Sequence, residues 1–279
     1  MTAPALATAP ILQDEAELEA LKRKIERERG FNCVRYKDKL LRRRLAVRMR
    51  ARGENGYAAY ARLLDQDPTE YERLLDTLTI NVSKFFRNSS TWDALEQRVL
   101  PVLFQLTGAV GVWSAGAAAG EEPYSVAMLL REWAERHGRT ADLGRFRIVG
   151  TDIDRRSLLT AERGEYADLA LTETRLDLRS RYFSPGPPYR LDETIRRSAH
   201  FHRRDLISDP PLEAQSLILC RNVVIYFERE EQERLFAGFC DVLRPGGFLV
   251  LGRVETLTGR ARANLRTIDA RERIFQKPS

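Results

Sequence analysis

The first part of the chain carries apolar residues with a helical period. The segment that ends at Gly30 places acidic side chains early and basic ones late, as the dipole of a helix favours. In the next segment Leu41, Leu45 and Met49 stand four residues apart. A neighbouring stripe with the same spacing consists of Arg44, Arg48 and Arg52. The pattern predicts an amphipathic helix with an arginine face, followed by two shorter helices.

Beyond about Ser90 the hydrophobic pattern changes. Apolar runs typical of buried strands alternate with amphipathic segments typical of helices. The expected strands are 109–115, 146–152, 216–222 and 246–252, and the expected helices are 91–106, 121–138, 154–164 and 228–244. This alternation predicts an α/β fold with a parallel sheet and helices on both faces. The stretch 267–276 suits edge strands, and the break in alternation at about 182–204 predicts a small antiparallel insertion.

These elements divide the chain into two expected domains. Residues 14–90 form a helical N-terminal domain with its linker, and residues 91–279 form the α/β domain with a β-subdomain at about 182–204. Residues 1–13 lack the basic start and apolar core of a secretion signal, and we interpret them as a disordered lead. Because no apolar run approaches the ~20 residues of a membrane span, we expect no membrane insertion.

Composition and charge limit the classes of protein to which this chain can belong. The chain is 43% hydrophobic and 31% charged, which is typical of a soluble globular protein. Cys33, Cys220 and Cys240 show no metal or disulfide spacing, which suits a reducing cytoplasm. The net charge is +6, and the segment 37–52 alone has two lysines and six arginines against one aspartate. Because a nucleic-acid enzyme usually spreads basic charge along its substrate path, this confined charge predicts one local acidic contact.

A glycine loop follows the first expected strand, in the stretch VWSAGAAAGEEPYSVAMLL. Gly116 and Gly120 form G-x-x-x-G, which is neither the dinucleotide fingerprint nor a P-loop. Glu121 and Glu122 open the next helix, where they would repel a pyrophosphate. The loop therefore favours a ligand with hydroxyls, an ammonium or a sulfonium group.

The end of the second expected strand adds a further acidic residue, Asp152. Ligands of open parallel sheets bind at the carboxyl ends of the strands, where this side chain can accept hydrogen bonds from ribose hydroxyls. An adenosine with a positive centre and no phosphate describes S-adenosylmethionine, whose demethylated product is S-adenosylhomocysteine. Helix capping is the alternative explanation for Glu121 and Glu122, since acids in a first turn stabilise a helix by ~0.3–1 kcal/mol.

Two other patterns carry less weight. The segment SDPPLEA is similar to the Asp-Pro-Pro-aromatic motif of nucleic-acid amino methyltransferases. It precedes a strand and places Leu212 where that motif has an aromatic residue, so a polyproline turn is favoured. His200 and His202 share one face of a predicted strand, but two ligands do not make a metal site, and we expect no metal.

Five motifs stand in order along nearly the whole chain. They are NVSKFFRN (81–88), GEEPYS (120–125), GTDID (150–154), CRNVVIYF (220–227) and LRPGGFLVLG (243–252). Together they resemble the chemotaxis receptor glutamate O-methyltransferases of the CheR type. The resemblance implies an all-α N-terminal domain before a class I, Rossmann-like S-adenosylmethionine-dependent methyltransferase sheet with a small antiparallel β-subdomain. The periodicity predicts a similar architecture independently.

The resemblance also implies roles for individual residues. Cofactor contacts are implied for Asn81, Ser83, Arg87, Glu121, Asp152, Asp205, Leu206, Arg221 and Asn222. Arg87 would pair with the cofactor's carboxylate, Glu121 would face its methionine part, and Asp152 would face the ribose. Catalytic roles are implied for Arg221, which would line the methyl-transfer site, and for Tyr226, which would lie near the substrate. The simpler alternatives are a surface arginine at 87 and an interfacial, helix-capping tyrosine at 226.

The chain departs from the family pattern in four places. Ser83 stands where the family often has Thr, and the hydroxyl is kept. Ala117–Ala119 replace the usual Cys-Ser-Thr, so the loop loses hydroxyls but keeps its expected backbone shape. Arg253 and Val254 replace His and Ser of the late Gly-His-Ser-Glu pattern, and no role is transferred to them. The insertion at 184–193 is short beside members that dock a receptor's C-terminal peptide there, so we expect no such tether.

The implied reaction moves a methyl group from S-adenosylmethionine to glutamate side chains of chemotaxis-type receptors, forming γ-methyl esters for sensory adaptation. With a reference pKa of ~4.3 glutamate is already ionised at neutral pH, so no general base is required. Receptor methylation regions are acidic helical bundles, which the arginine helix can attract. The candidate docking residues are Arg42, Arg43, Arg44, Arg48 and Arg50. The alternative is a solvated face whose arginine stems cover apolar surface.

Two other functions stay open. A non-catalytic regulatory module would bind S-adenosylmethionine and a signalling partner without turnover, and the altered GAAAGEE and GRVE segments allow it. A nucleic-acid methyltransferase is disfavoured by the confined charge and by Leu212. We therefore expect a cytoplasmic, monomeric protein methyltransferase that binds no nucleic acid.

Overall fold

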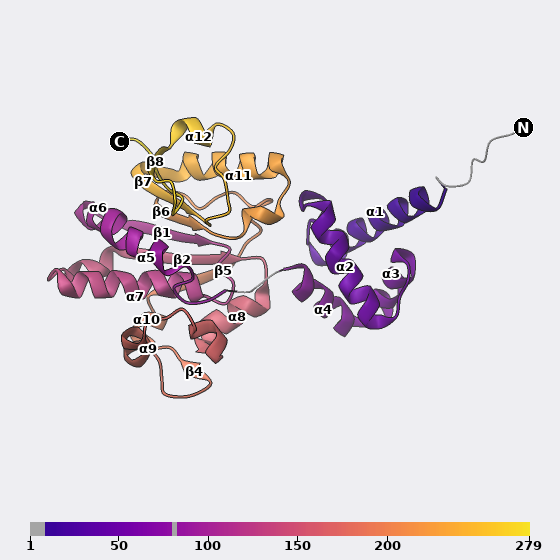
Figure 1. The fold of residues 1–279 in the computed structure, drawn as a ribbon, viewed down its shortest axis with the longest axis horizontal. Helices are drawn as coiled ribbons and strands as arrows, with labels where there is room; N and C mark the ends of the chain where they lie inside the picture. Colours follow the sequence, from indigo (N-terminus) through magenta and orange to yellow (C-terminus); the bar gives the residue numbers. More distant parts are fainter. Residues whose placement is uncertain (1–8, 80–82) are drawn as a thin grey trace, which may run out of the picture. The chain divides into compact units, whose positions relative to one another are not determined.

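The computed structural model describes residues 9–79 and 83–279, with side chains described from Asp14 onward. The contacts divide the chain into two compact units (Figure 1). The helical unit comprises Met1–Ile80 together with the short segment Tyr226–Glu228. The sheet unit comprises Asn81–Ile225 and Arg229–Ser279.

The helical unit contains the helices that the periodicity predicts. They are α1 (Ala9–Arg29), α2 (Asp38–Arg52), α3 (Tyr57–Gln66) and α4 (Pro68–Leu78). Helix α4 begins as its sequence indicates, because the Asp67 carboxylate accepts the N–H of Glu70 at 3.0 Å and Pro68 stands in the first turn. Helix α1 begins at Ala9, inside the segment expected to be a disordered lead.

The apolar stripe of α2 faces the core of this unit. Leu41, Leu45 and Met49 are buried, as their spacing predicts. The segment Tyr226–Glu228 adds to the same unit although it is remote in sequence. The N–H of Lys37 donates to the carbonyl oxygen of Tyr226 at 2.9 Å, and the ring centroids of Tyr36 and Phe227 stand 5.1 Å apart.

The sheet unit is built on a seven-stranded sheet with the order β5-β2-β1-β6-β7-β9-β8. Its strands are β1 (Val110–Ala115), β2 (Phe146–Asp152), β5 (Ala199–Arg203), β6 (Gln215–Cys220), β7 (Leu243–Leu251), β8 (Arg266–Asp269) and β9 (Ile274–Gln276). The strands from β5 to β7 are parallel, and β9 and β8 are antiparallel at one edge. The predicted fold class is confirmed. All residues of β6 are buried, as expected for a central parallel strand.

Helices flank this sheet. They are α5 (Ser89–Ala94), α6 (Leu100–Gln105), α7 (Glu121–Arg136), α8 (Arg155–Arg163), α9 (Leu176–Tyr182), α10 (Glu193–Arg196), α11 (Arg229–Val242) and α12 (Ala261–Asn264). A π-helical turn, Leu95–Val99, joins α5 to α6. Figure 1 shows α11 and α12 beside the edge that carries β7 and β8, and α9 and α10 beyond β5 at the other edge.

The expected antiparallel insertion differs from the observed structure in one strand. The small sheet pairs β3 (Glu165–Tyr166) with β4 (Tyr189–Arg190), and β4 lies within the expected range. The segment AHFHR, which was expected in the same insertion, instead forms β5 and pairs in parallel with β2. The alternating pattern of AHFHR is compatible with antiparallel pairing in the insertion and with parallel pairing to β2. The pattern alone does not determine which strand becomes its neighbour. Within the described residues, no helix is both long and apolar enough to cross a membrane.

Candidate active site

The loop after β1 depends on two glycines with left-handed backbone. Gly116 has φ +92°, and a Cβ atom there would stand 2.3 Å from Cγ2 of Val223. Gly120 has φ +89°, and a Cβ atom there would stand 2.8 Å from the Cβ of Ala161. Any larger residue would displace the loop from its neighbours, which explains the G-x-x-x-G spacing.

Backbone groups hold the three alanines of this loop in place. The N–H of Ala118 donates to Oδ2 of Asp152 at 2.8 Å, and the N–H of Ala117 donates to the carbonyl oxygen of Thr151 at 2.9 Å. The N–H of Gly120 closes the turn onto the carbonyl oxygen of Ala117 at 2.9 Å. These contacts need no side chain from the loop, so its shape does not depend on the missing hydroxyls.

Asp152 stands at the carboxyl end of β2 beside this loop. Its side chain is largely buried, and Oδ1 accepts the N–H of Asp154 at 2.9 Å. Burial raises the pKa of Asp152, and the N–H groups of Asp154 and Ala118 oppose that rise. A carboxylate has about four acceptor positions, so Asp152 can accept further hydrogen bonds from ligand hydroxyls.

Glu121 is the first residue of α7 and is only 4% exposed. Its Oε2 is buried and has no hydrogen-bond partner. Burial raises the pKa of Glu121 to about 7, although backbone N–H groups and the Ser83 hydroxyl favour its ionised form. An unpartnered buried carboxylate oxygen costs free energy unless a ligand supplies a donor or a positive charge.

Glu122 is adjacent in sequence but differs in its surroundings. Its Oε1 accepts the hydroxyl of Ser114 at 2.7 Å, and its Oε2 accepts Nη1 of Arg221 at 3.2 Å. Burial raises the pKa of Glu122, while the charge of Arg221 opposes that rise. Glu122 therefore anchors an arginine, whereas one oxygen of Glu121 has no hydrogen-bond partner within the protein.

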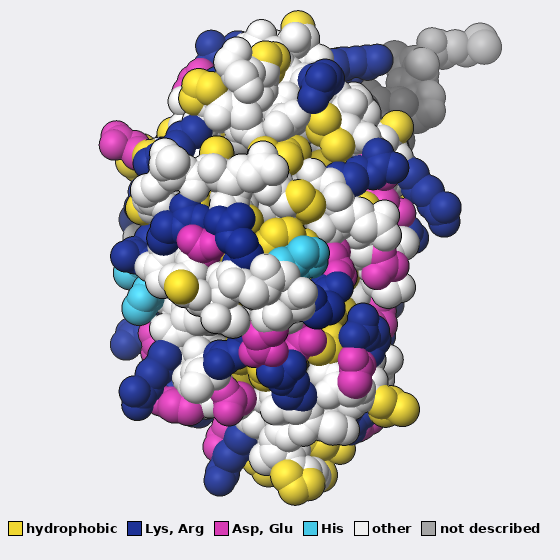
Figure 2. Space-filling model, turned by 90° about the vertical axis from the view of Figure 1, so that its left-hand side faces the viewer, with side chains coloured by type: hydrophobic (Ala, Val, Ile, Leu, Met, Phe, Trp, Pro, Cys, Tyr) yellow, Lys and Arg dark blue, Asp and Glu magenta, His cyan; other side chains and the backbone are white. Residues whose placement is uncertain are grey.

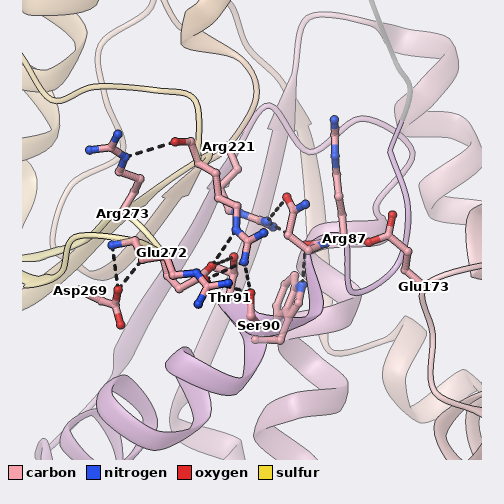
Figure 3. Close-up of polar contacts among 12 residues, drawn as sticks. Arg87, Ser90, Thr91, Glu173, Arg221, Asp269, Glu272 and Arg273 are labelled. Atoms are coloured by element: carbon pink, nitrogen blue, oxygen red, sulfur yellow. Dashed lines mark hydrogen bonds and ion pairs between the residues drawn. The ribbon is translucent and has the colours of Figure 1, made fainter.

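Arg221 is buried at the end of β6 and held from several sides (Figure 3). Its Nη2 donates to the carbonyl oxygen of Arg87 at 2.8 Å and to Oδ1 of Asn88 at 3.3 Å. The guanidinium carbon lies 5.5 Å from the ring centroid of Trp92. Its Nε is buried and has no hydrogen-bond partner. The expected catalytic arginine is thus fixed by the protein and retains one unpaired donor.

The segment before α5 contributes backbone and side chains to the same region. The N–H of Phe86 donates to the hydroxyl of Ser125 at 3.0 Å, which ties this segment to α7. Arg87 is half-buried, and its charge acts on the carboxylate of Glu122. Ser83 reaches Glu121, as described above, whereas the expected contact residue Asn81 lies outside the described residues.

Asn222 follows Arg221 with a left-handed backbone, φ +61°. Its Oδ1 is buried and has no hydrogen-bond partner. Three polar atoms near the carboxyl ends of β1 and β6 therefore share one property, since each is buried and unpaired. They are Oε2 of Glu121, Nε of Arg221 and Oδ1 of Asn222.

Asp205 and Leu206 lie in the turn that follows β5. The N–H of Arg204 donates to the carbonyl oxygen of Asp152 at 3.0 Å, so this turn lies beside the end of β2. The carboxylate of Asp205 accepts the N–H of Ile207 and the hydroxyl of Ser208, each at 2.9 Å. Asp205 is thus engaged in its own turn, and Leu206 is half-buried beside it.

Tyr226 belongs to the helical unit and not to the sheet unit. The guanidinium carbon of Arg44 lies 5.2 Å from its ring centroid. The same arginine donates from Nη1 to the carbonyl oxygen of Thr77 at 3.0 Å. Both side chains therefore take part in packing within that unit.

Family models match both parts of this chain. The all-alpha domain of the CheR methyltransferases matches residues 16–79, and their SAM-binding domain matches residues 81–274. The chain belongs to the CheR methyltransferase family. It is accordingly an S-adenosylmethionine-dependent methyltransferase, and the predicted family resemblance is confirmed.

Similar proteins include a chemotaxis protein methyltransferase of Listeria monocytogenes, which is 33% identical over 88% of this chain and 92% of its own length. An uncharacterized 104.1 kDa protein of Rhodobacter capsulatus is 35% identical over 88% of this chain, but the match covers only 26% of that protein. Among solved structures, the N-methyltransferase NodS of Bradyrhizobium japonicum covers 70% of this chain with 14% identity and a TM-score of 0.38.

The residues of this CheR family member fit the family's cofactor chemically. The unpaired oxygen of Glu121 suits an ammonium or sulfonium group, and the acceptor positions of Asp152 suit ribose hydroxyls. The unpaired Oδ1 of Asn222 can accept a further donor, and Nε of Arg221 can donate to an acceptor. None of these four groups favours a phosphate at the N-terminus of α7, because Glu121 and Glu122 occupy that position.

The arginines of α2 divide into two groups. Arg42 pairs with Asp38 and Glu15, Arg44 is engaged as described above, and Arg48 pairs with the buried Glu70. By contrast, Arg43 and Arg50 are exposed, as is Lys39 one turn before Arg43. The arginine stripe 44-48-52 therefore turns toward α4, and the solvent-facing stripe of the helix consists of Lys39, Arg43, Val47 and Arg50.

Sequence reasoning placed Glu122 at the start of the helix but did not show its partner, and it identified no contact for Ser114 or Glu255. The hydroxyl of Ser114 donates to Glu122, which pairs with Arg221, and the buried Glu255 contacts the backbone of Asn222. Arg253, which stands where the family pattern has His, forms an ion pair with Glu272 at 2.7 Å. This contact lowers the pKa of the Glu272 carboxyl to about 2.

Proposed function

We propose that this family member transfers the methyl group to glutamate side chains of chemotaxis-type receptors and forms γ-glutamyl methyl esters. The observation that carries the proposal is the buried, unpaired carboxylate oxygen of Glu121, at a site whose sequence matches the CheR methyltransferases. When bound, the cofactor supplies an electrophilic methyl group on a sulfonium centre. The protein's own residues then bind, orient and exclude water.

The proposed site contains the residues implied by the family motifs. We assign cofactor contacts to Asn81, Ser83, Arg87, Glu121, Asp152, Asp205, Leu206, Arg221 and Asn222. Asp205 is the weakest member of this set, because the match of Asp205 and Leu206 to the family pattern is short.

The contacts that hold the Arg221 guanidinium support the proposed formation of an ester. A free arginine would form a strong salt bridge with the substrate carboxylate and would reduce its nucleophilicity. Here Glu122 compensates the charge of Arg221, and the backbone of Arg87 occupies Nη2. We propose that Nε of Arg221 orients the substrate oxygen through one hydrogen bond, with Tyr226 as the second candidate catalytic side chain.

The docking surface is proposed on α2. Lys39, Arg43 and Arg50 are exposed on one face and would attract an acidic helical methylation region. Arg42, Arg44 and Arg48 are engaged within the helical unit, so their contribution to docking would be indirect. Figure 2 shows another aspect of the surface, where basic side chains are interspersed with acidic ones rather than gathered in a continuous patch.

The decisive experiment is a methyl-transfer assay. Candidate receptor membranes are incubated with the protein and S-adenosylmethionine that carries a labelled methyl group. We expect label on receptor protein that mild base releases as methanol, because methyl esters are base-labile and N-methyl groups are not. Label that resists base, or label on nucleic acid, would contradict the proposal. Tight binding of S-adenosylhomocysteine without any transfer would favour the regulatory module instead.

A further inference from the structure

Glu255 is a buried carboxylate outside the set of assigned contacts. It is only 2% exposed and lies just beyond β7. Its two oxygens accept hydrogen bonds from four backbone N–H groups. The donors are Asn222 at 3.0 Å, Val223 at 2.9 Å, Val224 at 3.0 Å and Gly252 at 2.6 Å. Burial raises the pKa of Glu255, and these backbone donors oppose that rise because they stabilise the ionised carboxylate.

These four donors come from two different strand ends. Three belong to the loop after β6, and the fourth, Gly252, directly follows β7, the neighbouring parallel strand. A Cβ atom at Gly252 would stand 2.7 Å from Oε2 of Glu255 and 2.8 Å from the backbone nitrogen of Asn222. Only glycine allows this approach, so the contact depends on the backbone of both strands.

The loop that Glu255 holds contains a left-handed backbone conformation. Asn222 has φ +61°, a region that residues other than glycine rarely occupy, although asparagine is among those that tolerate it best. Such a conformation persists when surrounding contacts over-determine it. Here the contacts of Glu255 to positions 222, 223 and 224 provide that restraint. The direction of the Asn222 side chain, whose Oδ1 is buried and unpaired, follows from this backbone.

We propose that Glu255 is a positioning residue for cofactor binding. Its carboxylate fixes the peptide groups of 222–224 and thereby aims the Asn222 amide oxygen at a cofactor donor. The inference rests on the proposed function, since it takes Asn222 as a cofactor contact.

Replacement by glutamine tests the proposal with little change in shape. In Glu255→Gln, one carboxylate oxygen becomes an NH₂ group that faces backbone N–H donors, so at least one hydrogen bond is lost. The matched control is Glu272→Gln. Glu272 is also buried, but it accepts the hydroxyls of Ser90 and Thr91 and the guanidinium of Arg253 (Figure 3), and it does not contact the loop 222–224.

The primary measurement is calorimetric binding of S-adenosylhomocysteine, at a temperature where each variant is folded by circular dichroism. We expect Glu255→Gln to bind about tenfold more weakly than wild type and Glu272→Gln to bind within about twofold of it. In an Asn222→Ala background, the Glu255 substitution should cause less than about a twofold further loss, because the two residues act through one contact. An equal loss in both backgrounds, or no loss at all, overturns the proposal.

A second measurement needs no variant, in case Glu255→Gln does not fold. The amides of Asn222, Val223 and Val224 should exchange slowly with deuterium in the ligand-free wild type, because Glu255 already holds them. Fast exchange at all three positions would overturn the proposal. Wild-type binding of S-adenosylhomocysteine serves as the reference for the proposed site. If the wild type does not bind, the proposed cofactor site fails; if it binds and Glu255→Gln binds equally well, only the positioning role fails.

Discussion

Two buried glutamates, one in each unit, occupy similar positions and have opposite electrostatics. Glu70 lies in the first turn of α4, and Glu121 is the first residue of α7. Glu70 accepts Nε of Arg48 at 2.9 Å and the hydroxyl of Tyr60 at 2.7 Å. Burial alone would raise its pKa, but these partners lower it, whereas the pKa of Glu121 is raised to about 7.

The two glutamates differ in whether the protein itself offsets the cost of burying the carboxylate. A helix N-terminus favours a carboxylate by well under 2 kcal/mol, which does not offset full burial. The helical unit offsets the burial of Glu70 with its own arginine. The sheet unit leaves one oxygen of Glu121 unpaired, together with polar atoms of Arg221 and Asn222. The first arrangement is satisfied within the protein, and the second leaves polar atoms unpaired where we propose that the cofactor binds.

The largest expected effect comes from removing the partner of Glu70. Arg48→Met keeps the apolar stem but removes the nearer cation of Glu70 and leaves only Arg52, whose Nε lies 3.9 Å from Oε2. We therefore expect a loss of about 3–5 kcal/mol in unfolding free energy. Urea denaturation measures this loss. Arg23→Ala, at an exposed position on α1, is the control and should change stability by less than about 0.5 kcal/mol. A small loss for Arg48→Met would mean that Arg48 is free for docking.

The second prediction concerns the pH dependence of Glu121 without cofactor. Its pKa is about 7 in the folded protein and about 4.5 in the unfolded chain. Between these values the folded protein binds more protons, so the contribution of Glu121 is complete below pH 4.5 and is lost as the pH rises through 7. Relative to Glu121→Gln, the wild type should lose about 3 kcal/mol of stability across this window. Denaturation at a series of pH values measures the difference, and parallel profiles would contradict it.

The same group predicts a preference between two ligands. Ionised Glu121 attracts a sulfonium more strongly than a neutral thioether. The affinity ratio of S-adenosylmethionine to S-adenosylhomocysteine should therefore rise with pH through about 7 in wild type and stay flat in Glu121→Gln. Calorimetry with both compounds measures the ratio. A ratio that rises equally in the variant would place the titrating group elsewhere.

Glu122 lies between Glu70 and Glu121 in how far the protein compensates its charge, because Arg221 is its one charged hydrogen-bond partner. Glu122→Gln keeps a hydrogen bond to Ser114 but removes the charge that balances Arg221, and we expect a stability loss of about 2 kcal/mol. Because Arg221 is then less well fixed, binding of S-adenosylhomocysteine should weaken by about tenfold. Ser114→Ala removes only the neutral hydrogen bond and should have a smaller effect on both. An equal effect of the two changes would show that charge is not the cause.

The smallest expected effect concerns the exposed face of α2. Alanine at both Arg43 and Arg50 should raise the receptor Michaelis constant about threefold at low salt and leave kcat unchanged, because exposed charges contribute less than about 1 kcal/mol each. The effect should fade at physiological salt, where the screening length is ~8 Å. Arg23→Ala again provides the control. A change in kcat alone would argue against docking.

Sequence reasoning was most successful where neighbouring strand ends meet. The positions of Glu121 and Asp152 follow from the rule that the carboxyl ends of parallel strands share one edge of a sheet. The alternation of strands and helices was equally informative, because buried parallel strands such as β6 are continuous apolar runs.

Other features depend on residues far away in the chain. The stripe of Arg44 and Arg48 was expected to face solvent, but α4 covers it, and its partner Glu70 gives no signal within α2. Similarly, the role of Glu255 depends on Asn222, which only the pairing of β6 with β7 brings near. A local pattern shows which side chains share a face, but not what packs against that face.

The short segment Tyr226–Glu228 has a consequence for how the protein can be divided. The chain leaves the sheet unit after Ile225, contributes three residues to the helical unit, and returns at Arg229. A fragment that ends at residue 80 would lack Phe227, which packs against Tyr36. The complementary fragment would expose that phenylalanine in a loop a few residues beyond Asn222. A domain exchange between relatives that keeps the contact of Phe227 with Tyr36 must therefore transfer this loop together with the N-terminal helices.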